Sequence, residues 1–297
     1  MAVCNALAGV YESLPADSLR GRDMATIATP VIQRERRRDL LSGTPRAHAI
    51  DRWIFVATAA WFILIVLTGF IPDALMKVAA VQAGQRPPFP LVLHFHAVLM
   101  GSFLLLLLTQ SVLMATGRCE LHKRVGIASF ALVPALVVVG IILAPTIYHQ
   151  VWDFAQVAPA GVKQEMQGRL LALENILLLQ MRIGILFPLF FAIGLMARGV
   201  NAGLHKRMMF LATAMPLPAA IDRMTWLPTT LPGSPVSTDL YILLAVSPLF
   251  VWDVVRNRRV HEAYWIWMAV NVPFALIAYA LWDTAGWHSA ARQIMGV

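Results

Sequence analysis

Residues 53–72, WIFVATAAWFILIVLTGFIP, form a run of twenty residues without a charged side chain. A helix of about 20 apolar residues is long enough to cross the hydrocarbon layer of a membrane. The whole chain has the same character, with 59% hydrophobic and 13% charged residues in 297, whereas soluble domains carry about 25% charged residues. The stretch therefore predicts the first transmembrane helix of a membrane protein.

Further apolar runs predict an all-α, polytopic transmembrane helical bundle. We expect about seven spans, at residues 53–72, 91–116, 125–147, 172–197, 208–227, 239–255 and 263–282. The fifth and sixth are weaker because Asp222, Arg223 and Asp253 interrupt them. The chain then divides into a cytoplasmic basic N-terminal segment (1–52), largely irregular, the transmembrane domain (53–285) and a short outer C-terminal tail (286–297).

The basic residues predict the orientation. With residues 1–52 in the cytoplasm, 17 of the 24 Lys and Arg lie on the inner side and five on the outer side. Membrane proteins concentrate Lys and Arg in their cytoplasmic loops. We therefore expect a cytoplasmic N-terminus and a periplasmic C-terminus. Because the net charge of +8 is explained by these loops, the expected partner is the lipid bilayer and not nucleic acid.

One tetrapeptide occurs twice, as Leu121-His122-Lys123-Arg124 and Leu204-His205-Lys206-Arg207. Each copy stands where a basic loop gives way to an apolar run. Because His122 and His205 share a depth, they could face each other as axial ligands of a b-type haem. The alternative is that the adjacent cations contact lipid headgroups, so that the motifs are only topological anchors. His261 stands in the same layer, beside the last span.

A second set of ligand-type side chains is expected near the outer boundary. At a rise of 1.5 Å per residue, His94, His96 and Glu174 lie roughly 33–36 Å above the inner basic residues, and His149 is close to that level. Imidazoles and a carboxylate can hold a first-row transition metal and leave a position open for substrate. His94 and His96 can share one ion only if the helix start is irregular. The alternative is that these histidines are polar tips at the interface.

Between the two layers lie charges inside predicted spans. Arg182 and Asp222 both fall roughly 23 Å above the inner face, with Asp239 at a similar height. Since an intramembrane arginine is costly without a partner, we predict that Arg182 pairs with Asp222. On the metal hypothesis, Arg182, Asp222 and Arg223 position an anionic or polar group below the ion. The alternative is an ion pair that only fixes how the helices pack.

Several short motifs resemble those of a group of uncharacterised bacterial multi-span inner-membrane proteins of about seven helices. The resemblance covers most of residues 50–290 and implies a location in the bacterial cytoplasmic membrane. It implies no activity, because none is established for that group. The residues that carry it are Leu93-His94-Phe95-His96, Gln110, Gly117-Arg118, Leu121-His122-Lys123-Arg124, Gly126, His205-Lys206-Arg207-Met208, Thr213, Ala220 and Arg223.

Three functions remain open at this point. The first is a metal- or haem-linked redox membrane protein with a polar site toward the outer face. The second is a non-catalytic accessory subunit of a larger respiratory or photosynthetic membrane complex. The third is a small-molecule or proton-coupled transporter that uses the intramembrane charges. No residue pattern in the chain identifies a catalytic group.

Overall fold

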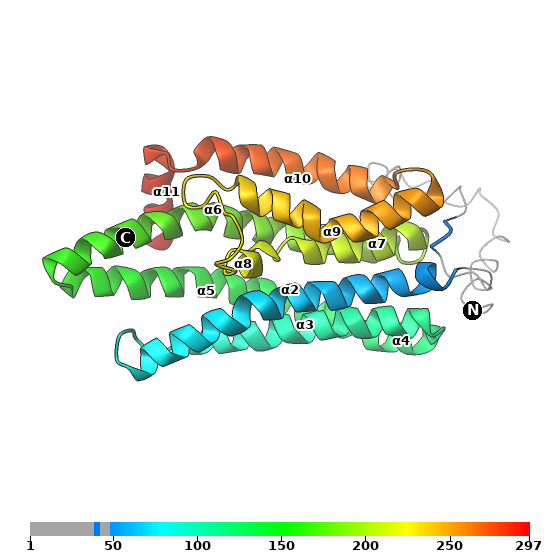
Figure 1. Ribbon diagram of the computed structural model, residues 1–297, viewed down its shortest axis with the longest axis horizontal. Coiled ribbons are helices and arrows are strands. Elements are labelled where there is room, and N and C mark those ends of the chain that lie inside the picture. The colour runs from blue at the N-terminus through cyan, green and yellow to red at the C-terminus, as the bar shows by residue number, and fades with distance from the viewer. Residues whose placement is uncertain (1–38, 42–47) are drawn as a thin grey trace, which may run out of the picture.

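The computed structural model describes residues 39–41 and 48–297, and within them the regular structure is α-helical. Most of the expected segment 1–52 lies outside the described residues. The long helices run side by side along the longest axis of the molecule (Figure 1). The helices are α2 (Ala49–Gln82), α3 (Leu91–Ala115), α4 (Cys119–Gly126), α5 (Ser129–Val157), α6 (Ala160–Ala197), α7 (Ala202–Ala214), α8 (Pro218–Ile221), α9 (Val236–Asn257), α10 (Glu262–Leu281) and α11 (Ala285–Met295).

Six segments of the described chain are helical, long and apolar enough to cross a membrane. They are α2, α3, α4 with α5, α6, α9 and α10, which supports a multi-pass membrane protein. Their outer surfaces carry large apolar side chains such as Leu64, Val98 and Ile141, each more than half exposed. Lipid chains can cover such side chains, whereas water cannot do so without a large cost.

The predicted span 208–227 is not a continuous helix. α7 ends at Ala214, a turn follows, and the four-residue α8 begins at Pro218. Pro216 and Pro218 cause the break because proline has no N–H for the helical ladder and clashes with the preceding turn. An irregular connection, residues 222–235, then leads to α9.

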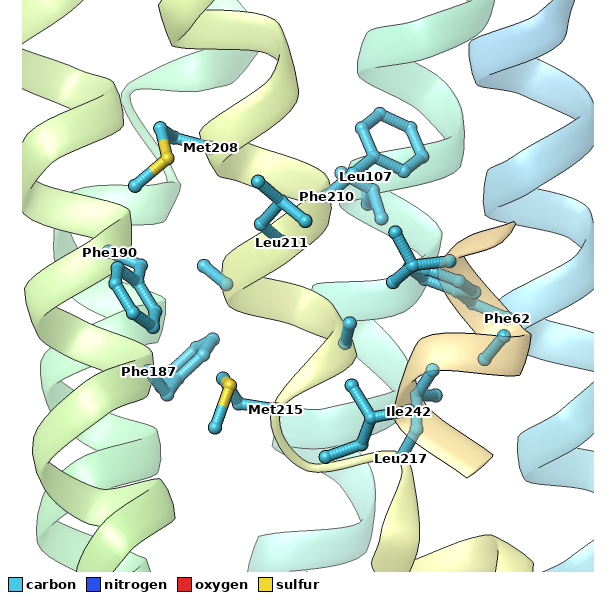
Figure 2. Packing of buried hydrophobic residues seen from close by; sticks show 14 of the residues in the cluster. Phe62, Leu107, Phe187, Phe190, Met208, Phe210, Leu211, Met215, Leu217 and Ile242 are labelled. Atoms are coloured by element: carbon cyan, nitrogen blue, oxygen red, sulfur yellow. The ribbon is translucent and has the colours of Figure 1, made fainter. Parts of the chain in front are cut away.

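α7 occupies the middle of the bundle, and nine of its 13 residues are buried. It contacts α6, α9 and α10. Figure 2 shows Leu211 and Met215 inside the apolar core, with Phe187 and Phe190 of α6 beside them. Because other helices surround this segment, protein rather than lipid satisfies the backbone groups freed at its break.

The ends of the long helices extend beyond the predicted spans. α5 continues to Val157 and α6 begins at Ala160, so only two residues separate them at the outer end. The expected C-terminal tail contains α11, whose Trp287, Ala291 and Met295 are buried. α11 packs on α5 and α6 and covers one end of the bundle (Figure 1).

Gly69 allows α2 to lie directly against the broken segment. A Cβ atom at this position would clash with the backbone carbonyl of Ala220, next to the end of α8. A backbone atom cannot move aside as a flexible side chain can. We expect Gly69→Ala to lower the free energy of unfolding by about 1–3 kcal/mol, the usual cost of overpacking a core.

Gly101 provides the matched control, because it also lies inside a membrane helix but a Cβ there meets no atom within 4 Å. Gly101→Ala should stabilise the helix by about 0.5–1 kcal/mol. Thermal unfolding in detergent measures both variants. Equal melting temperatures for Gly69→Ala and Gly101→Ala would contradict the close contact of α2 with α8.

Candidate functional site

The two repeated motifs meet at one end of the bundle, which the excess of Lys and Arg predicts to be the inner end. The rings of His122 on α4 and His205 on α7 lie with their centroids 6.4 Å apart and their planes at 86°. His205 Nδ1 is 2.7 Å from the carbonyl oxygen of Gly194 on α6. If Nδ1 carries the hydrogen and donates it there, Nε2 keeps a free lone pair, as in most metal-binding histidines.

Unsatisfied polar atoms lie beside this histidine pair. Within the described chain, His122 Nδ1 and both amide atoms of Gln110 are buried and have no hydrogen-bond partner. The Gln110 amide lies against Gly126 at the end of α4, where an added Cβ would be 3.6 Å from Nε2. Native proteins pair nearly all such buried atoms with protein, water or a ligand.

The element that carries His122 is weakly packed. None of the eight residues of α4 is buried, whereas His205 belongs to the central helix and is fixed by Gly194. One member of the pair is therefore rigid. The other lies on a helix that adds no residue to the buried core.

Two residues after His205 on α7, Arg207 is at the centre of a buried ionic network. Its side chain is fully buried. It donates to Asp253 of α9 at 2.5 and 2.7 Å and to Asp39 at 3.0 Å through two nitrogens. Tyr264 and Asn257 donate to the same Asp253 carboxylate at 3.0 and 2.7 Å. The network joins α7, α9 and α10 to the chain that precedes α2.

The sequence did not predict this network. In the sequence, Asp253 is recognisable only as a charge that weakens a span, and Arg207 only as a topological cation. One feature of the sequence could have indicated the network. A charged residue inside a membrane span is costly without a partner, so Asp253 required a cation nearby. Asp39 lies more than 160 residues from Arg207, and no local pattern indicates that contact.

At mid-depth, Arg182 of α6 pairs with Asp239 of α9 and not with Asp222. Its guanidinium donates to the two Asp239 oxygens at 2.6 and 3.1 Å, and to Asn271 of α10 at 2.8 Å. Tyr279 also donates to Asp239. The predicted pairing with Asp222 assumed a straight helix, and the break after Ala214 removes that assumption.

Arg223, the fourth residue of the expected polar group, faces α2 instead. Its Nε lies 3.2 Å from Asp73 Oδ2, and Asp73 also accepts from Lys77 at 2.5 Å. The guanidinium also lies 4.5 Å from the centre of the Phe70 ring. Of the four predicted residues, Arg182 and Asp239 therefore pair, whereas Arg223 belongs to a separate contact with α2.

Near the outer end, Glu174 is fully buried and bound by three donors. Tyr148 donates at 2.9 Å, Arg292 at 2.8 Å, and His288 Nδ1 lies at 2.6 Å. His288 and Arg292 both come from α11. The carboxylate expected to bind a metal thus anchors the C-terminal helix.

The three histidines of the predicted outer metal site have separate surroundings. His149 Nε2 lies 2.8 Å from the carbonyl oxygen of Met295, and His94 Nδ1 lies 3.3 Å from that of Pro90. His96 Nδ1 is buried without a partner among the described residues. In the part of the chain that the structure describes, no three His, Cys, Asp or Glu side chains are grouped as metal ligands.

No protein-family model, curated protein or solved structure matches this chain.

The Arg182–Asp239 pair can be tested by rescue. Arg182→Met leaves Asp239 charged inside the bundle, and we expect it to lower the free energy of unfolding by about 3–5 kcal/mol. Adding Asp239→Asn should restore more than half of that loss. The matched control adds Asp222→Asn to Arg182→Met, and it should restore none of the lost free energy of unfolding. Thermal unfolding in detergent measures all variants. Rescue by Asp222→Asn but not by Asp239→Asn would contradict the observed pairing.

The Asp39 carboxylate should make stability depend on pH. Burial alone would raise its pKa, but Lys206 and Arg207 hold the pKa well below its usual range. The stabilisation is therefore present above the unfolded-state pKa of about 3.9 and is lost as the pH falls toward the folded-state value. We expect Asp39→Asn to cost about 2 kcal/mol at pH 7.

The difference in stability between the wild type and Asp39→Asn isolates this effect from other carboxylates. It should be constant between about pH 5 and 8 and shrink below about pH 4. Thermal unfolding in detergent at a series of pH values measures it. A difference that grows on acidification would contradict the ionised Asp39 in the folded protein.

Proposed function

We propose that the protein is an integral membrane redox protein that binds a b-type haem through His122 and His205 near the inner end of the bundle. The observation that carries the proposal is the approach of these two rings, 6.4 Å apart with perpendicular planes. A bound haem would supply reversible one-electron oxidation and reduction of its iron.

The ring spacing fits ligation from opposite sides. Two imidazoles that bind one metal ion through opposite bonds of about 2.1 Å have ring centres about 6 Å apart. The contact of His205 Nδ1 with Gly194 orients Nε2, as second-shell contacts do in metal sites. A protein-only metal site would require at least one further ligand, and the described residues offer no such group.

The surroundings of the pair support a ligand of some size. The unsatisfied His122 and Gln110 atoms gain a partner when a polar or metal-containing group binds. The role of the chain would be to hold the two imidazoles, exclude water from the α7 side and fix the ring orientation through Gly194.

The proposal places the site at the inner end rather than at the outer layer. Glu174 is already bound by Tyr148, His288 and Arg292, so recruiting it for a metal would leave those donors unpaired. Such buried donors are costly to leave unsatisfied. The inner pair needs no such rearrangement.

We further propose that this inner end faces the cytoplasm of a bacterial cell, with the C-terminus in the periplasm. The support is the excess of Lys and Arg on the inner side, 17 against five. The chain then crosses the inner membrane seven times, six times as a long helix and once through α7, α8 and the connection to α9.

A visible absorption spectrum of the purified protein tests the haem directly. We expect a Soret band that shifts on reduction with dithionite, and about one haem per chain. Removing an axial ligand costs most of the affinity, so His122→Ala and His205→Ala should each reduce the bound haem at least tenfold. His94→Ala, an exposed histidine at a helix start, is the matched control and should retain it.

Folding is checked by elution volume and melting temperature. A folded protein without a Soret band, before and after addition of haemin, would contradict the proposal. If that protein also co-purified with a larger membrane complex, the accessory function would replace it. Retention of haem in His122→Ala and His205→Ala together would show that other residues bind it.

A further inference from the structure

Four cationic side chains come close together near the outer end of α2, and we call them the outer basic cluster. They are Lys77 of α2, Arg86 of the connection to α3, Arg169 of α6 and Arg223 after α8. Arg86 is repelled by Arg169, and Lys77 is repelled by Arg223 and Arg86. The end of α2 and the beginning of α6 lie at the same end of the bundle (Figure 1). Separate segments form the cluster, so the fold brings its charges together.

The chain places few cations on this side of the membrane. Five of the 24 Lys and Arg are predicted to be outside, and three of those five belong to the outer basic cluster. One carboxylate, Asp73, accepts from Lys77 at 2.5 Å and from Arg223 at 3.2 Å. Even with Asp222, which attracts Arg223, the four cations face two carboxylates. The cluster therefore carries more positive charge than its neighbours balance.

Arg86 has a donor that water does not reach. Its Nε atom is buried and has no hydrogen-bond partner among the described residues. Its guanidinium lies over the Phe89 ring, 5.1 Å from the ring centre, and this contact leaves the in-plane N–H groups free to donate. Burial and the repulsion by Arg169 lower the pKa of Arg86, whereas Asp73 acts in the opposite sense. An added anion would satisfy the buried donor and offset the repulsion.

Arg169 provides a second guanidinium without a bonded partner. Its side chain is exposed on α6. Glu165 stands one turn earlier on the same helix, but no ion pair or hydrogen bond joins the two within the part of the chain that the structure describes. Arg86 and Arg169 therefore offer free donors from two different segments of the chain.

The depth of the cluster selects the anion. Measured along α2 from Trp53, Asp73 lies about 30 Å and Lys77 about 36 Å away, at a rise of 1.5 Å per residue. The hydrocarbon layer is about 30 Å thick, so the cluster stands at the level of the outer lipid headgroups. The anion that a bilayer supplies at this level is the lipid phosphate, and guanidinium groups bind phosphate oxygens through two parallel hydrogen bonds.

We propose that Arg86 and Arg169 bind the phosphate of an anionic phospholipid in the outer leaflet, while Lys77 and Arg223 add positive charge beside it. A zwitterionic phospholipid carries its own cation next to the phosphate, and the cluster would repel that cation. Phosphatidylglycerol has no such cation, so the site selects anionic lipids. The site is independent of the haem proposed at the other end of the bundle.

Native mass spectrometry tests the site in the full-length protein in detergent. Phosphatidylglycerol or phosphatidylcholine is added, and the fraction of protein that carries one lipid gives a dissociation constant for each. We expect phosphatidylglycerol to bind at least tenfold more tightly, equivalent to about 1.4 kcal/mol. Arg86→Gln with Arg169→Gln should remove this preference. Arg86→Lys, which keeps the charge but loses the planar set of donors, should retain part of it.

Lys163→Gln is the matched control, because it removes another exposed cation of α6 that lies outside the cluster. It should leave both dissociation constants unchanged, and the melting temperature shows that each variant is folded. Equal affinity of the wild type for the two lipids would overturn the proposal, as would equal losses in Lys163→Gln and in the cluster variants. Full displacement of phosphatidylglycerol by inorganic phosphate would show that the cluster binds a free anion instead of a lipid.

Discussion

A charged side chain within the hydrocarbon layer has to find its partner inside the protein, because lipid chains offer none. The rest of this structure depends on that constraint. Arg182 lies in the middle of α6 and binds Asp239 and Asn271, while Arg207 at the inner end binds Asp253 and Asp39. These contacts fix α6, α7, α9 and α10 relative to one another at two depths, and Glu174 does the same for α11 at a third.

The other half of the bundle has a different character. On α3 and α4, both amide atoms of Gln110 and the Nδ1 atom of His122 are buried without a hydrogen-bond partner among the described residues. α4 has no buried residue. The buried charges of α6, α7 and α9 therefore find partners inside the protein, whereas α3 and α4 retain buried polar atoms that a ligand can satisfy. The proposed haem lies between the two halves, with His122 on α4 and His205 on α7.

The sequence predicted what depends on composition and on depth. Runs such as 53–72 identified an all-α membrane protein, and helical rise correctly placed His122 with His205, whose rings lie in contact range. The helical rise per residue did not identify the partner of Arg182, because Pro216 and Pro218 break the segment that leads to Asp222. It also did not connect Glu174 to His288, since contacts between distant segments depend on how α11 folds back onto the bundle. The predicted outer metal ligands His94, His149 and Glu174 have similar predicted depths, but each contacts a different group. A similar depth therefore does not bring side chains on different helices together.

The central proposal, that His122 and His205 would bind one haem, has a direct spectroscopic test. Ferric haem between two imidazoles with perpendicular planes gives a highly anisotropic low-spin electron paramagnetic resonance signal, whereas parallel planes give an ordinary rhombic one. With the ring planes at 86°, we predict the highly anisotropic signal in the oxidised protein, and its loss in His205→Ala. A high-spin signal, or no ferric signal in folded protein incubated with haemin, would contradict the claim.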